Sequence, residues 1–162
     1  MITIYPNVFK TNEPHYLTIE QFIELIRSGG KSKDIILQLR QTQDKSQKDA
    51  LKKTLPQICL GGKFNYRNKE GCVEHSGLIP LDFDGLDKES VIAMSPYIYI
   101  AWVSPSGNGT RAVVKVPPII ENHEKYFAAL HDHFNTNFWD NNVGTVVGGS
   151  YMSYDPDIYV NE

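Results

Sequence analysis

GLIPLDFDGLD, residues 77–87, contains the apolar run LIPLDFD (78–84), which predicts a strand that ends in the carboxylates Asp82 and Asp84. Alternate side chains of a strand share one face, so Asp82 and Asp84 point together while Leu81 and Phe83 point the other way. Carboxylates about 7 Å apart along a strand can chelate hard cations such as Mg²⁺ or Mn²⁺. Because charges at the end of an apolar strand are costly without a compensating cation or donor, the pair predicts a divalent-metal site.

A simpler interpretation is open for the same residues. Gly85 allows a tight turn, so Asp84-Gly85 also suits the end of a strand with Asp82 exposed to solvent. Pro80 has no amide hydrogen, and this predicts that the strand lies at an edge of its sheet or contains a bulge.

Around this strand, the apolar pattern predicts an α/β (α+β) chain whose N-terminal half is mainly helical and whose C-terminal half is rich in strands. Thr18 and Gln21 form a capping-box pattern at the first helix. The expected strands cover residues 2–9, 57–67 with a glycine bend, 78–84, 97–103, 111–116 and one or two segments of the tail, and the expected helices cover 18–28, 34–41, 46–55, 88–94 and 121–134.

The composition is that of a folded protein of 162 residues with 41% hydrophobic residues and a net charge of −3. Residues 31–70 hold ten basic and four acidic side chains, a net of +6, which leaves −9 for the remainder. A basic half beside an acidic one suits a polyanion held near metal-binding carboxylates, although a solvated helical surface has the same composition. No apolar run is long enough for a membrane span, the N-terminus lacks a signal-peptide pattern, and two cysteines indicate a reducing, cytoplasmic setting.

SPSGNGTR, residues 104–111, lies between two apolar strands and therefore predicts a hairpin. It lacks the GK[ST] ending of a nucleotide-hydrolase P-loop. An ordinary hairpin turn explains the loop equally well, but small residues can expose backbone amides to a phosphate. The candidate phosphate contacts are Ser104, Ser106, Gly107 and Gly109, followed by Arg111 and Lys115 on one face of the next strand.

Three long segments together resemble the VirE N-terminal-domain family of the archaeo-eukaryotic primase superfamily. They are LRQTQDKSQKDALKKTLPQICLGGKFNYRNKEGCVEHSGLIPLDFDGLD (39–87), SPSGNGTRAVVKV (104–116) and SYMSYDPDIYVN (150–161). The resemblance implies a single primase–polymerase domain over residues 1–162. Its N-terminal α/β lobe with a basic surface would span 1–75, and an RRM-like lobe carrying the carboxylates would span 76–162.

The same resemblance implies site residues. The superfamily's D-x-D motif falls on Asp82 and Asp84, and its third carboxylate falls on Asp140. Where the superfamily usually has a nucleotide-contacting histidine, this sequence has Arg111. Where the family commonly has an arginine, eight residues after the third carboxylate, this sequence has Gly148. Retained carboxylates favour metal binding, whereas these two departures favour a catalytically decayed nucleotide- or nucleic-acid-binding domain.

The implied activity is DNA primase or polymerase nucleotidyl transfer in a phage, plasmid or other mobile-element replication system. Asp82, Asp84 and Asp140 would hold Mg²⁺ or Mn²⁺ and act as the catalytic residues. The expected partners are a single-stranded DNA template, nucleoside triphosphates and a helicase domain or protein. Matching segments also nominate Lys53, Arg67 and His75 as cleft-lining residues, and Phe64 or Tyr66 for stacking on a base.

Overall fold

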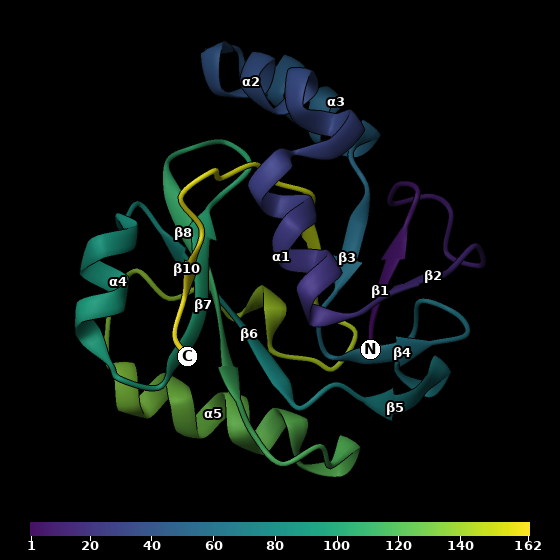
Figure 1. The fold of residues 1–162 in the computed structure, drawn as a ribbon, viewed down its shortest axis with the longest axis vertical. Coiled ribbons are helices and arrows are strands. Elements are labelled where there is room, and N and C mark those ends of the chain that lie inside the picture. The colour runs from purple at the N-terminus through teal and green to yellow at the C-terminus, as the bar shows by residue number, and fades with distance from the viewer.

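A computed structural model describes residues 1–162 and shows two four-stranded antiparallel sheets (Figure 1). The first sheet has the order β2-β1-β3-β9, the second has the order β10-β7-β8-β6, and β4 and β5 form a separate hairpin. The strands are β1 (Ile2–Tyr5), β2 (His15–Leu17), β3 (Gln57–Cys59), β4 (Gly62–Phe64), β5 (Cys72–His75), β6 (Leu78–Asp84), β7 (Ile98–Val103), β8 (Gly109–Lys115), β9 (Gly149–Tyr151) and β10 (Tyr159–Val160).

The helices are α1 (Ile19–Ser28), α2 (Lys33–Gln41), α3 (Lys45–Thr54), α4 (Lys88–Met94) and α5 (His123–Phe134). The mixed α+β class predicted from the sequence is confirmed. No helix of the chain has the length and apolar character that a membrane span requires.

Local sequence signals explain where several elements begin and end. Thr18 and Gln21 make the predicted capping box at the start of α1, and Gly29 ends that helix with a φ of 75°. The first strand stops at Tyr5 rather than at residue 9, because Pro6 has no amide hydrogen with which to extend the ladder. Neither β2 nor β5 was predicted, since each is too short to show an apolar period.

The expected strand over residues 57–67 is two strands in different sheets. β3 ends at Cys59, and β4 begins at Gly62 and pairs with β5. Gly61 lies at the break, where a side chain has no space because a Cβ atom would be 2.2 Å from the Val146 carbonyl oxygen. The glycine bend was therefore located correctly, but it separates two sheets.

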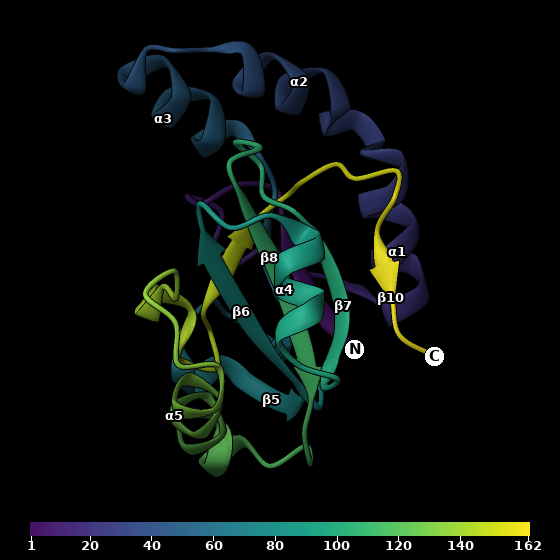
Figure 2. The same ribbon diagram turned by 90° about the vertical axis from the view of Figure 1, so that its left-hand side faces the viewer.

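The second sheet has one helix-covered face. Along the chain, β6, α4, β7, β8 and α5 follow one another, and α4 packs in front of the sheet in Figure 2. Ile79, Leu81 and Phe83 of β6 form a core with Val91 of α4 and Phe127 of α5. Because side chains alternate along a strand, the remaining β6 residues face the opposite side.

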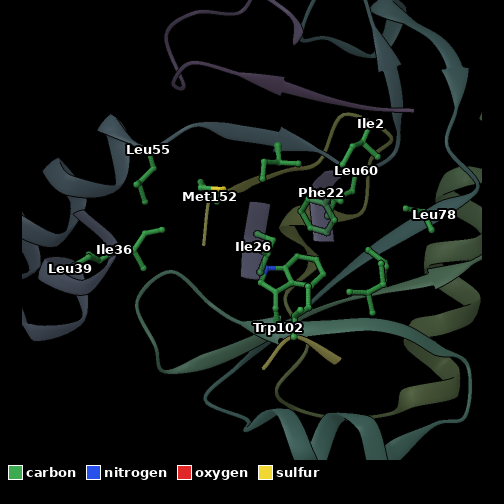
Figure 3. Packing of buried hydrophobic residues seen from close by; sticks show 14 residues of the cluster. Ile2, Phe22, Ile26, Ile36, Leu39, Leu55, Leu60, Leu78, Trp102 and Met152 are labelled. Carbon is green, nitrogen blue, oxygen red and sulfur yellow. The ribbon is translucent and has the colours of Figure 1, made fainter. Parts of the chain in front are cut away.

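That opposite side packs toward the first sheet and α1 (Figure 3). Trp102 of β7 meets the edge of Phe22 of α1, with ring centroids 5.2 Å apart. Ile2 of β1 and Ile58 of β3 belong to the same core. Segments 1–75 and 76–162 therefore share one continuous core, and β9, from the C-terminal segment, completes the first sheet.

Candidate metal centre

Asp82 and Asp84 lie on β6, which is an edge strand of the second sheet, as the presence of Pro80 predicted. On one side β6 pairs with β8, where Asp82 is opposite Arg111 and Asp84 is opposite Gly109. On its other side a short segment, residues 138–140, continues the ladder. The Asp84 amide donates to the Phe138 carbonyl at 2.8 Å, and the Asp140 amide donates to the Asp82 carbonyl at 2.9 Å.

Trp139 anchors this short segment. It forms a bridge with Phe83, and its ring lies 5.6 Å from the Phe83 ring and 5.0 Å from the Phe127 ring, in the core beneath α5. Because neighbouring side chains of an extended segment alternate, burial of Trp139 directs Asp140 to the face that Asp82 occupies.

The structure thus brings together the three predicted carboxylates. One oxygen from each of Asp82, Asp84 and Asp140 lies within 4.8 Å of the others. Asp82 is only 4% exposed, whereas Asp84 is exposed and Asp140 is half-buried. The simpler interpretation, a strand end with Asp82 in solvent, is therefore wrong.

Arg111 connects the carboxylates to the first sheet. Its Nη1 lies 2.7 Å from Asp82 Oδ2 and donates to the hydroxyl of Ser150, on β9, at 3.3 Å. Asp82 Oδ1 and Arg111 Nε are both buried without a hydrogen-bond partner. The predicted basic residue is therefore at the site, and one buried carboxylate oxygen there has no ligand within the chain.

Burial raises the pKa of Asp82 to about 6, against the opposing effect of Arg111. The nearby charges of Asp84 and Asp140 raise it further, and Lys52 of α3 lowers it. The site therefore holds more negative charge than Arg111 compensates, in a place where water solvates it poorly.

The residues fit a hard divalent cation. Mg²⁺ and Mn²⁺ take oxygen ligands, and two oxygens on opposite sides of one Mg²⁺ are about 4.2 Å apart. The three carboxylate oxygens lie within 4.8 Å of one another, so small side-chain rotations must bring them closer around a single ion. The unpartnered Oδ1 of Asp82 supplies a donor that is already desolvated and free of competing hydrogen bonds.

Residues 104–108 connect β7 to β8 as the predicted hairpin, but its amides are engaged internally. Gly109 donates its amide to the Ser104 hydroxyl at 3.1 Å, and Gly107 donates to the Ser104 carbonyl at 3.0 Å. The Ser106 hydroxyl donates to the Asn108 side chain at 2.6 Å. In this conformation these groups stabilise the turn instead of projecting toward a ligand.

Arg40, at the end of α2, holds this hairpin in place. Its guanidinium donates to the carbonyls of Ser104 at 3.1 Å, Pro105 at 3.3 Å and Tyr154 at 2.7 Å. Sequence reasoning missed it, since its partners are far away along the chain and no local pattern marks them. Arg40 joins the helical hairpin of α2 and α3, seen above the β7–β8 turn in Figure 2, to the second sheet.

A polar cavity of about 450 Å³ lies on the other side of the same turn, between the start of α4 and the C-terminal tail. It borders Gly85 and Gly109 and contains the buried ion pair of Lys88 with Asp155, whose Nζ and Oδ2 are 2.7 Å apart. The carboxylate cluster does not line this cavity.

Other predicted residues lie apart from the carboxylates. Lys115 is opposite Leu78, four positions along β8 from Arg111, and its ammonium lies 3.7 Å from the Tyr99 ring centroid. Lys53 is exposed on α3, where its neighbour Lys52 is the lysine whose charge reaches Asp82.

The contacts of Arg67 and His75 are also elsewhere. Arg67 donates to the Val8 carbonyl at 3.4 Å, and His75 pairs with His123 at 2.9 Å. Of the two residues expected to stack on a base, Phe64 is fully buried in a small core and cannot do so, whereas Tyr66 is 46% exposed.

Gly148 has a steric explanation. A Cβ atom there would lie 2.5 Å from the Val143 carbonyl oxygen. The turn between Asp140 and β9 therefore excludes a side chain at the position where the resembled family commonly has arginine.

Fold and site together define an α+β domain with an acidic cluster where the edge of one sheet faces a second sheet. The chain belongs to the family described as BT4734-like, N-terminal domain, which it matches over residues 50–160. All three carboxylates and Arg111 fall inside that range, whereas Arg40 precedes it. No curated protein and no solved structure matches the chain.

Proposed function

We propose that this chain is a divalent-metal-dependent nucleotidyltransferase domain of the primase–polymerase type. The observation that carries the proposal is the cluster of Asp82, Asp84 and Asp140, whose oxygens lie within 4.8 Å beside the guanidinium of Arg111. Convergent carboxylates that can hold divalent ions suit two-metal phosphoryl transfer.

The three aspartates would hold Mg²⁺ or Mn²⁺, which supplies charge stabilisation and a more acidic hydroxyl nucleophile when bound. In the proposed reaction, a primer 3′-oxygen forms a bond to the α-phosphorus of a nucleoside triphosphate, the hydroxyl proton passes to water, and pyrophosphate leaves with the electron pair of the broken P–O bond. In this proposal Arg111 and Lys52 attract the triphosphate, and the support for it is that the charge of each lowers the pKa of Asp82.

Further features support a nucleic-acid substrate and a primase-like arrangement. The segment of residues 31–70, which carries a net positive charge, includes α2 and α3, and these helices project at one end of the molecule in Figure 1. The succession β6-α4-β7-β8-α5, with both helices in one core, suits an RRM-like lobe. We therefore propose single-stranded DNA as template and a replication role in a mobile element, in partnership with a helicase.

A non-catalytic binding domain is the second candidate, and one contact favours it. Nη1 of Arg111 is already committed to Asp82 and Ser150 within the chain, so part of its charge is neutralised before any triphosphate binds. In this alternative, the metal and nucleotide bind but no bond is made.

One assay separates the two candidates. The purified chain is incubated with Mn²⁺ or Mg²⁺, single-stranded template with and without primer, and labelled ribo- or deoxynucleotides. Asp84→Asn is the control, because it removes the charge of an exposed side chain while keeping its size. Metal binding is measured in parallel by Mn²⁺ electron paramagnetic resonance.

Labelled products longer than the primer, absent with Asp84→Asn, would establish nucleotidyl transfer. Mn²⁺ and nucleotide binding without any product would establish the second candidate instead. Template shortening would indicate phosphodiester hydrolysis. A wild-type protein that binds no Mn²⁺ would refute nucleotidyl transfer, metal–nucleotide binding and hydrolysis alike.

A further inference from the structure

An exposed aromatic side chain stands beside the carboxylates. Phe138 is 44% exposed and is one of eight large apolar side chains of this chain that are exposed. Its carbonyl accepts the amide of Asp84 at 2.8 Å, and the bridge between Phe83 and Trp139 places Phe138 directly across the ladder from Asp84. Side chains in such opposite positions have Cβ atoms about 5 Å apart.

The alternation of side chains sets the face on which Phe138 lies. Trp139 is packed into the core beneath α5, so its neighbours Phe138 and Asp140 lie on the opposite face. This is the face of Asp82 and Asp84. Phe138 therefore flanks the carboxylate cluster on its own side of the ladder.

Gly85 leaves the ring uncovered. This residue turns the chain after β6 with a φ of 75°, and the Cβ that it lacks would contact Phe138 Cδ1 at 3.9 Å. A side chain at position 85 would cover part of the aromatic ring, whereas glycine keeps it open. An open aromatic ring next to a metal-binding cluster suits a ligand that has both a flat base and metal-bound phosphates.

We propose that Phe138 stacks on the base of a nucleoside triphosphate whose phosphates would be held by the divalent metal bound to Asp82, Asp84 and Asp140. The inference rests on the proposed function and names its substrate-contacting aromatic residue. Stacking needs only the flat face of a base, so the contact favours nucleotides over inorganic polyphosphate without selecting one base.

The test compares two ligands by calorimetry in the presence of Mn²⁺: ATP, and inorganic tripolyphosphate, which has no base. Phe138→Ala is expected to weaken ATP binding about 5- to 150-fold and to leave tripolyphosphate binding unchanged. Phe138→Leu, which keeps an apolar side chain, is expected to weaken ATP binding similarly, whereas Phe138→Tyr retains it. Phe9→Ala, at a 74% exposed phenylalanine in the loop after β1, is the matched control and leaves both affinities unchanged.

Equal ATP affinity of wild type and Phe138→Ala, with loss in Asp84→Asn, would overturn the stacking proposal while leaving the metal–nucleotide site intact. Wild-type binding of tripolyphosphate but not of ATP would overturn it as well. Failure of the wild type to bind Mn²⁺ would overturn the proposed function itself, and the stacking proposal with it. Near-equal thermal unfolding of the variants confirms that the comparison reports binding.

Discussion

The buried pair of His75 and His123 predicts a specific loss of stability in acid. His75 Nδ1 accepts the Gly77 amide at 2.9 Å, so its proton is on Nε2, which donates to His123 Nδ1 at 2.9 Å. The His123 proton is then on Nε2, which is buried without a partner. An imidazolium has no acceptor nitrogen, so protonating His123 removes the acceptor of the bond between β5 and α5, and protonating His75 removes the acceptor of the Gly77 amide.

The direction and size of the effect follow from the pKa values. Burial lowers the pKa of His123 to about 4, assisted by His75 and opposed by Glu124 and the backbone at Thr145. Burial also lowers the pKa of His75. A histidine whose pKa is lower in the folded state binds fewer protons in the folded protein than in the unfolded chain. Its contribution to the free energy of unfolding is therefore complete above the unfolded-state pKa of 6.5 and is lost as the pH falls. For His123, the loss between pH 7 and pH 5 is about 2 kcal/mol.

The assay is urea unfolding at pH 7 and pH 5, in wild type and in His123→Gln. The variant is expected to be less stable at pH 7 but to lose about 2 kcal/mol less than wild type between the two pH values. His131→Gln is the matched control, because His131 lies on the same helix with its side chain 48% exposed. The reasoning is refuted if wild type and His123→Gln have the same pH dependence, or if His131→Gln changes it as much.

Two further substitutions test how the site is assembled. Arg40→Ala is expected to lower the free energy of unfolding by about 3 kcal/mol in urea titration, because three carbonyls lose a charged donor. Full restoration of that stability by Arg40→Lys would contradict the role of the guanidinium group. Trp139→Leu is expected to weaken Mn²⁺ binding about 10-fold or more, because the packed indole positions Asp140. Unchanged Mn²⁺ affinity in a folded variant would show that Asp140 is held by its backbone alone.

Most elements could be predicted because their signals are local. The strand that carries Asp82 and Asp84 matches its expected range, and the Thr18 cap is present as its sequence pattern indicates. Asp140 was nominated by resemblance alone, since no spacing connects it to β6. Phe138 was missed because a lone aromatic residue in a polar segment carries no periodic signal, and Phe64 was misassigned because its burial depends on distant strands.

The sequence by itself determined the α+β class, the strand of β6 and the shared face of its two carboxylates, because period-2 alternation acts between neighbours in the chain. Only the tertiary structure decided that Asp82 is buried, that Arg111 pairs with it, and that Trp139 carries Asp140 and Phe138 to the same edge. Those outcomes depend on which edge of β6 remains free and on the shape of the core beneath α5. Such long-range packing is set by many residues at once, and no short segment encodes it.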